Sequence, residues 1–278
     1  MIKNILVALD GSEHSRAAVE YALWLAEKFS GTVFGQHVID TVSIEGTFFQ
    51  DISGSLGFEP YLDFSVKMRE VLEERGKAIL EEFRQRCKER GIRCETFLDL
   101  GIIPNEICER SKVADLVTIG HRGVNEEFST GLLGGTTESV TRKSPRPVFV
   151  STKRFKEVEH PLLAYDGSQR ASSAMESAAE FCARLKLPLT VLYIPKEEAS
   201  GEKVLHEARS YLSSYGIEVR YELGKGYPEQ KIIEVLVNSN YDLLFIGAYG
   251  HRRIIEMVLG STTEYVLRNS PCPVFLNR

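Results

Sequence analysis

Two stretches of this chain repeat one another, and the repetition limits the folds that the chain can adopt. Residues 120–138 read GHRGVNEEFSTGLLGGTTE, and residues 247–264 read GAYGHRRIIEMVLGSTTE. Each follows an apolar, strand-like run and leads through a helix-like segment to a strand that begins Pro-x-Pro-Val-Phe. A strand that runs through a glycine-bracketed loop into the start of a helix is suited to holding phosphate. The sequence therefore predicts two copies of one phosphate-loop unit.

The beginnings of the two copies match as well. Asp10 and Asp166 each open an Asp-Gly-Ser sequence at the end of a short apolar run. These aspartates lie 156 residues apart, whereas Gly120 and Gly247 lie 127 apart, so the first copy carries about 29 more residues in its middle. We predict domains at 1–152 and 158–278, with an insertion at about 41–66 in the first. Whether that insertion is a lid, an interface patch or a packed surface segment stays open.

Strand-like and helix-like segments alternate within each copy. This alternation predicts an α/β fold: two tandem doubly wound domains, each a five-stranded parallel sheet with helices on both faces, for which we take the strand order 3-2-1-4-5. Ser12 and Ser168 are expected to cap the first helices. In this order strands one and four flank the point where such sheets bind ligands, so Asp166 and Gly247 should converge on one crevice. The later strands are predicted at 32–39, 93–98, 116–119 and 148–151 in the first copy, and at 189–194, 218–223, 243–246 and 274–277 in the second. A charged helix is predicted in each copy, at 69–90 and at 202–215, and a further helix is predicted after Pro104 and after Pro228.

Composition and charge exclude several classes of protein. Hydrophobic residues make up 43% of the 278 residues and charged residues 26%, as in packed globular proteins. No apolar run approaches the roughly 18–20 residues of a membrane span, and the N-terminus does not resemble a signal peptide. The net charge of −5, without a basic stripe, argues against nucleic acid or anionic membrane as a partner. The five cysteines have no CxxC spacing, which indicates free thiols in a reducing compartment and thus a cytoplasmic protein. The histidines show no metal-ligand motif, so we expect no structural metal.

The glycine loop of the second copy carries the chemistry expected for phosphate. Gly247 and Gly250 are followed by Gly260 and Ser261, with nine residues between Gly250 and Gly260. Glycine lacks Cβ, so a phosphate can come close to the backbone amides. The amides and hydroxyls at the start of the next helix can donate to phosphate oxygens, supported by the positive end of the helix.

This loop, together with the Asp-Gly-Ser at strand one, resembles the universal stress protein family. ATP-binding members of that family carry G-x2-G-x9-G-[S/T] after strand four, and the second copy fits this spacing without a gap. The resemblance covers essentially the whole chain and implies an adenine-nucleotide alpha-hydrolase-like fold that binds ATP, ADP or AMP, with any Mg²⁺ carried on the phosphates. It places Asp166 at the ribose and the backbone near Ile194 at the adenine. The remaining site residues implied by the resemblance are Ile246, Gly247, Tyr249, Gly250, Gly260, Ser261, Thr262 and Thr263.

The first copy departs from this pattern. Ten residues separate Gly123 from Gly134, and Gly135 stands where a serine or threonine is expected. Glu126 and Glu127 replace the arginines of the second loop, and carboxylates beside a triphosphate are unfavourable. We therefore predict one well-formed site in the second copy and a weaker or empty one in the first. The residues of the weaker site are Asp10, Val38, Gly120, Gly123, Gly134, Gly135 and Thr136.

Three functions remain open at this point. The first is a stress-response regulator that binds an adenine nucleotide, mainly in the C-terminal domain, and lacks a named catalytic residue. The second is a slow ATPase or a related enzyme, although no Walker A, SGGxDS or HIGH motif occurs. The third is a nucleotide-free dimerisation scaffold. The resemblance suggests that the last strands of the two domains pair about a pseudo-twofold axis. Which stress the protein responds to, which protein it binds and whether it forms a homodimer stay open.

Overall fold

The strands form one continuous sheet across both domains. The computed structural model describes residues 2–41, 61–123, 133–195, 201–248 and 260–277. Within these ranges the sheet order is β3-β2-β1-β4-β5-β10-β9-β6-β7-β8, which confirms the predicted order 3-2-1-4-5 in both domains. Pairing is parallel within each domain and antiparallel between β5 and β10, so the last strands join the domains. The strands are β1 (Asn4–Ala8), β2 (Thr32–Asp40), β3 (Cys94–Gly101), β4 (Leu116–Gly120), β5 (Val148–Ser151), β6 (Pro161–Ala164), β7 (Leu189–Tyr193), β8 (Val219–Leu223), β9 (Leu243–Gly247) and β10 (Val274–Asn277).

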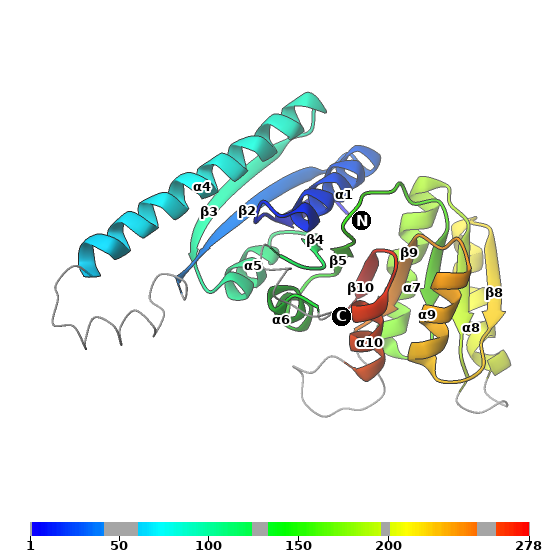
Figure 1. The fold of residues 1–278 in the computed structure, drawn as a ribbon. Coiled ribbons are helices and arrows are strands. Elements are labelled where there is room, and N and C mark those ends of the chain that lie inside the picture. The colour runs from blue at the N-terminus through cyan, green and yellow to red at the C-terminus, as the bar shows by residue number, and fades with distance from the viewer. Residues whose placement is uncertain (1, 42–60, 124–132, 196–200, 249–259, 278) are drawn as a thin grey trace, which may run out of the picture.

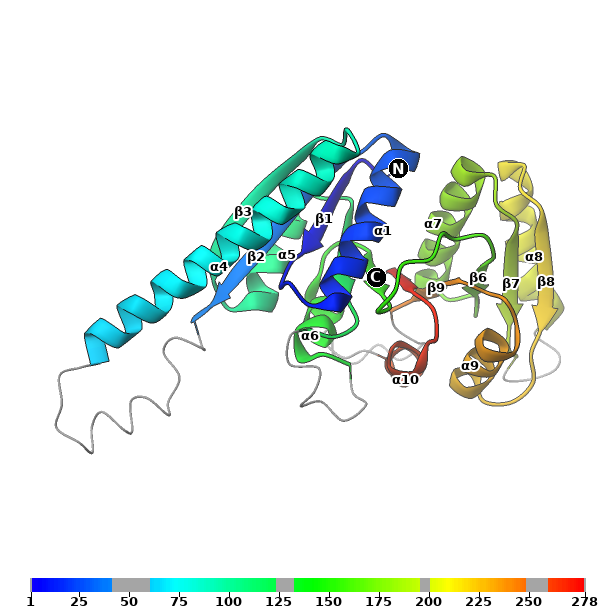
Figure 2. The same cartoon turned by 45° about the horizontal axis from the view of Figure 1, so that its top comes forward.

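Helices cover both faces of this sheet (Figures 1 and 2). In the first domain α1 (Glu13–Phe29) and α4 (Tyr61–Glu89) lie on one face, and α5 (Ile103–Ser111) and α6 (Gly135–Lys143) lie on the other. The second domain repeats the arrangement with α7 (Gln169–Leu185), α8 (Gly201–Leu212) and the short η3 (Ser213–Tyr215) on one face, and with α9 (Pro228–Asn238) and α10 (Ser261–Asn269) on the other. Among the described residues no helix is long and apolar enough to cross a membrane.

The helix α4 differs most from its prediction. It begins at Tyr61, eight residues before the predicted start, and in Figure 1 its N-terminal half projects past the edge of the domain. The predicted insertion at 41–66 therefore ends in helix, and residues 42–60 lie outside the described part of the chain. Apolar periodicity is weak where a helix has no sheet to pack against, so the sequence marked only its packed half.

Serine caps and glycine turns start the first helix of each domain. Ser12 Oγ accepts a hydrogen bond from the backbone nitrogen of Ser15 at 3.1 Å, and Ser168 Oγ accepts one from Ala171 at 3.2 Å, so both predicted caps are confirmed. The glycines before them, Gly11 and Gly167, have φ angles of +80° and +78°. Glycine adopts this conformation without steric strain, which explains why both turns read Asp-Gly-Ser.

Two hydrophobic layers hold the sheet between the helices, and each layer runs through both domains. Aromatic rings bridge the domain boundary in one layer: Phe149 of β5 is paired in register with Phe275 of β10, with ring centroids 6.4 Å apart. Phe275 also lies 4.9 Å from Phe245 of β9. The two domains therefore share a core at the β5–β10 junction.

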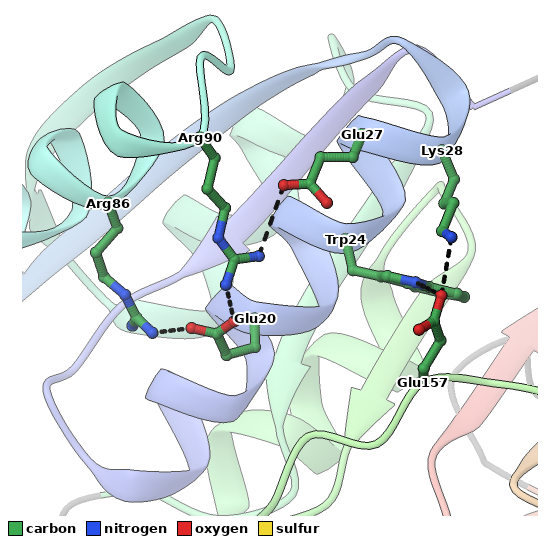
Figure 3. A network of polar contacts seen from close by, with 7 residues as sticks. All are labelled: Glu20, Trp24, Glu27, Lys28, Arg86, Arg90 and Glu157. Atoms are coloured by element: carbon green, nitrogen blue, oxygen red, sulfur yellow. Dashed lines mark hydrogen bonds and ion pairs between the residues drawn. The ribbon is translucent and has the colours of Figure 1, made fainter.

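Polar contacts on one face tie α1 to α4 and to the segment between the domains (Figure 3). The carboxylate of Glu20 accepts from Arg86 of α4 and from Arg90, the residue directly after that helix. On the neighbouring turns of α1, Trp24 Nε1 donates to Glu157 at 3.0 Å and Lys28 Nζ lies 2.8 Å from the same carboxylate. The interdomain segment is thus fastened to the first domain through Glu157.

Replacing Glu157 by glutamine should reduce the dependence of the free energy of unfolding on pH in the acidic range. The hydrogen bond and charge of Lys28, with the donor of Trp24, hold the pKa of Glu157 below its ordinary value of 4.5. The stabilisation is therefore complete above pH 4.5 and is lost as the pH falls through the lower folded-state pKa. Because the side chain is 55% exposed, the pair contributes at most about 1 kcal/mol.

Urea denaturation at several pH values between 3 and 7 measures this effect. The stability difference between wild type and Glu157→Gln should shrink as the pH is lowered. Glu159→Gln, two residues away on the same segment, is the matched control. A difference that is constant with pH would contradict the role assigned to Glu157.

Candidate functional site

A pocket opens in the first domain where β1 and β4 end. Its volume is about 320 Å³, within the range of small-molecule sites. It contains all seven residues that the sequence suggested for the weaker site, including Asp10, Val38 and Gly135. The tertiary structure thus brings together segments that lie up to about 130 residues apart. The lining consists of Ala8, Leu9, Asp10, Ser15, Gln36, Val38, Ile103, Ile107, Ile119, Gly120, Arg122, Gly123, Gly134, Gly135, Thr136 and Thr137.

Asp10 is held at the mouth of this pocket by the turn that follows β1. Its Oδ1 accepts a hydrogen bond from the backbone nitrogen of Ser12 at 2.8 Å, and its own backbone nitrogen donates to Ser15 Oγ at 3.2 Å. The chain after β4 comes close to the same carboxylate, because a Cβ on Gly123 would lie 2.8 Å from Asp10 Oδ2. Glycine at this position therefore lets the backbone at residue 123 come close to the carboxylate of Asp10.

The glycines that end β4 and β9 have a packing role. A Cβ on Gly120 would meet the backbone carbon of His14 at 2.8 Å, and one on Gly247 would meet the backbone carbon of Arg170 at 2.7 Å. Both positions lie against the first turn of a helix, α1 or α7. Gly120 and Gly247 are thus required by helix–sheet packing, whether or not a ligand is present.

The helix that follows the loop begins in the same way in both domains. Thr137 Oγ1 donates to the carbonyl of Gly120 at 2.7 Å, and Thr263 Oγ1 donates to the carbonyl of Gly247 at 3.1 Å. These bonds fix the start of α6 or α10 beside the end of the strand. The N-cap residues are glycines, so no side chain caps the first amides of either helix. The uncapped amides can donate to an anion.

The two helix starts differ by one side chain. A Cβ on Gly135 would have no atom within 4 Å, so the first helix offers open space at this place. Ser261 occupies the matching position in α10 and adds a hydroxyl. The next residue, Thr262, donates to Glu229 at 3.4 Å.

Several of the other residues predicted for the second site lie in the described part of the chain. Asp166 is exposed after β6, and its Oδ1 accepts from the backbone nitrogen of Ser168 at 3.0 Å. Ile194 and Ile246 are buried behind it, after β7 and in β9. Gly260 caps α10. The predicted site residues Tyr249 and Gly250, and the loop charges at 126–127 and 252–253, lie outside the described residues.

Sequence reasoning missed several residues of the first-domain pocket. Ile103 and Ile107 of α5 form an apolar wall, and Arg122 lies beside Gly123. Gln36 is buried within the sheet two residues before Val38, on the same face of β2. A polar side chain inside the run Thr-Val-Phe-Gly-Gln-His-Val-Ile was a signal that the sequence offered.

A half-buried histidine, His37, lies in β2 between the pocket residues Gln36 and Val38. The Nδ1 atom of His37 is 2.7 Å from the carbonyl oxygen of Leu9, which lines the pocket. Burial lowers the pKa of His37, although the bond to Leu9 opposes this shift. The neutral imidazole therefore donates from Nδ1 and braces the end of β1.

The helices that begin at the two loops touch across the domain boundary. His121, directly after β4, has Nε2 2.6 Å from the carbonyl oxygen of Leu267 in α10. Arg268 of α10 pairs with Glu264 at 2.7 Å and lies 3.8 Å from Glu138 of α6. The residue directly after β4 in the first domain therefore contacts the helix that starts at the loop of the second.

Comparisons with known proteins agree with the duplication. Residues 1–152 and 158–278 each match the model of the Universal stress protein family. A universal stress protein of Synechocystis is 28% identical over 287 aligned residues, and the alignment covers 100% of both chains. The crystal structure of a universal stress protein from Archaeoglobus fulgidus superposes with a TM-score of 0.78 at 26% identity, covering 99% of this chain and 98% of that one. The chain therefore belongs to the universal stress protein family, as a member with two tandem domains.

Proposed function

We propose that this chain is a stress-response protein that binds an adenine nucleotide, ATP, ADP or AMP, mainly in its C-terminal domain. The observation that carries the proposal is the uncapped start of α10 beside the end of β9. There Ser261 follows the glycine N-cap, and Asp166 projects from the end of β6 on the other side of the parallel-sheet switch point. Phosphates would accept from the helix amides, and the ribose hydroxyls would donate to Asp166.

The first domain supports this assignment because its equivalent elements enclose a pocket. Asp10, the end of β4 and the start of α6 surround about 320 Å³. The same framework is repeated at Asp166, β9 and α10, with one more hydroxyl at Ser261. We propose that this hydroxyl, together with the loop arginines seen in the sequence, makes the second site the stronger one and leaves the first weaker or empty. Any Mg²⁺ would be carried on the phosphates.

We place the protein in the cytoplasm and assign it a regulatory role without fast turnover. Its five cysteines are all free thiols, as is usual in a reducing compartment. The contact between His121 and Leu267 gives nucleotide binding at one domain a direct path to the other. Whether the partner is a second copy of the chain or another protein is a separate question.

The test is denaturing extraction of the purified protein, with bound nucleotide identified by mass and quantified per chain. We expect about one adenine nucleotide per chain, present on purification or taken up from added ATP. No nucleotide after incubation with ATP would favour the scaffold function. Two nucleotides per chain with equal affinity would overturn the ranking of the two sites. Turnover above about 1 s⁻¹ would favour an enzyme.

A further inference from the structure

The two sides of the domain junction are equivalent by the repeat, but only one of them is filled. Between them lie Phe149 and Phe275, which face each other in register where β5 meets β10. On the filled side the interdomain segment covers α1: the ring of Phe155 lies 4.8 Å from that of Tyr21, and the backbone nitrogen of Lys156 donates to the Tyr21 hydroxyl at 3.1 Å. On the open side, beside α7, lies a cavity of about 210 Å³ that Phe275 helps to line.

Two aspartates establish this equivalence and show what the open side lacks. Asp115, before β4, and Asp242, before β9, each accept hydrogen bonds from two consecutive backbone nitrogens at the beginning of their own domain, at 2.8–3.0 Å. On the filled side Lys156 Nζ lies 3.6 Å from Asp242, which is 5% exposed. Asp115 lines the cavity, is more exposed than Asp242, and forms no ion pair with any residue that the structure describes. The open side therefore has the anion but not the cation of its counterpart.

Substitutions between the two copies change the chemistry of the open side. Ser177 of α7 stands where α1 carries Tyr21, so a small hydroxyl replaces a ring. Arg146 stands where the second copy carries Cys272, within otherwise identical Ser-Pro-x-Pro-Val-Phe runs. Arg146 and a second carboxylate, that of Glu180, both line the cavity. The open side is thus smaller in its own side chains and richer in charge than the filled side.

The polar groups of the cavity are held in place by other parts of the fold. Arg146 is exposed and its Nη2 donates to the carbonyl oxygen of Lys112 at 2.9 Å, but within the described ranges it has no carboxylate partner. Ser177 Oγ accepts from Asn277 Nδ2 at 2.8 Å. Together with the two amides that hold Asp115, these bonds fix an anion, a cation and a hydroxyl before any ligand arrives, which lowers the entropic cost of binding.

The remaining lining is apolar. Ile2, Phe29 and Pro147 line the cavity, with the buried rings of Phe181 and Phe275 beside them. The volume is below the roughly 300–1,000 Å³ of pockets for drug-sized ligands, so the cavity suits a smaller molecule. The lining therefore calls for a small ligand with a positive group, a negative group and an apolar part.

We propose that the open side of the junction binds a free α-amino acid with an apolar side chain. Its ammonium pairs with Asp115, as the ammonium of Lys156 does with Asp242 on the filled side. Its carboxylate pairs with Arg146, whose planar guanidinium suits carboxylate oxygens. Its side chain lies against the apolar lining. This site shares no residue with either proposed nucleotide site, so the inference does not rest on the proposed function.

Calorimetric titration of the full wild-type chain with L-alanine, L-leucine and L-phenylalanine tests the site. The amino acid that binds most tightly is then compared with two analogues, the amine that lacks its carboxylate and the acid that lacks its amino group. Because each charge has its own partner in the cavity, loss of either should weaken binding by at least about 10-fold.

Two variants use the residues of the filled side. Arg146→Cys should remove the advantage of the amino acid over its amine analogue. Ser177→Tyr should abolish binding, because the ring would occupy the cavity. Arg154→Cys, at an exposed arginine of the interdomain segment, is the matched control and should bind as the wild type does. Melting temperatures show whether each variant is folded.

The outcomes separate this inference from the proposed function. It would be overturned if none of the three amino acids bound the wild type, if the amine analogue bound as tightly as the amino acid, or if Arg146→Cys left the preference unchanged. Each of these results leaves the nucleotide content of the wild type, measured by denaturing extraction, as an independent readout of the proposed function. The analogue comparison uses the wild type alone, so it decides the question even where Ser177→Tyr fails to fold.

Discussion

Substituting Gly260 by aspartate should abolish nucleotide binding in the C-terminal domain without weakening the fold. Gly260 is the N-cap of α10, with φ −61° and ψ 146°, a backbone conformation that aspartate adopts readily. Aspartate is a favoured N-cap, so its carboxylate would take the helix amides that are now uncapped. Two like charges about 4 Å apart repel strongly at a partly buried site, so nucleotide affinity should fall by at least about 100-fold.

Equilibrium binding of ATP and thermal melting measure the two halves of this prediction. The melting temperature should stay equal to that of the wild type or rise, which separates lost binding from lost structure. Gly134→Asp is the matched control, because Gly134 is the N-cap of α6 in the first domain. That variant should keep the single high-affinity nucleotide. Nucleotide retained by Gly260→Asp, and lost from Gly134→Asp, would place the stronger site in the first domain.

Substituting Phe275 by alanine should cause the largest loss of stability. Phe275 is 2% exposed in β10, opposite Phe149 of β5 and 4.9 Å from the ring of Phe245. Removing a buried phenylalanine side chain leaves a cavity and costs about 3–5 kcal/mol. Since the ring lies where the two domains share a core, the change should reduce the cooperativity of unfolding as well as its free energy.

Urea denaturation followed by tryptophan fluorescence and by circular dichroism measures this effect. Trp24, the single tryptophan of the chain, lies in α1 with its ring 6.0 Å from that of Phe181 in α7, so its fluorescence reports on the first domain and on its contact with the second. The two probes should coincide for the wild type and separate for Phe275→Ala. Phe155→Ala, at a ring that is 37% exposed, is the control and should cost about 1 kcal/mol or less. A similar small loss for Phe275→Ala would contradict a shared core.

Local chemistry explains why much of the fold could be predicted from the sequence. The Asp-Gly-Ser turns need a glycine with positive φ followed by a capping serine, and both requirements are visible as residue types. The parallel sheet followed from the alternation of strands and helices, and the strand order 3-2-1-4-5 is one of the few topologies that connection geometry allows. The predicted start of α4 was wrong, because a projecting helix has little packed surface that would require apolar residues at helical spacing in its sequence.

The glycines of the loop show a different limit. The spacing of Gly120 and Gly247 pointed to phosphate, but their positions are explained by the close approach of α1 and α7. A glycine required by packing and one required by a ligand are identical in sequence. Gly135 is distinguished only by the open space around it in the structure.

The sequence by itself determined the duplication, the alternation of strands and helices, the helix caps and which residues end the strands, because these depend on residue type and on spacing along the chain. Only the tertiary structure decided that the side-chain nitrogen of Gln36 donates to Asp99, and that His121 reaches Leu267 in the other domain. The physical reason is distance in sequence: Gln36 and Asp99 are 63 residues apart, and His121 and Leu267 are 146 apart. Such contacts are set by how the sheet brings strands and domains together, which no local pattern encodes.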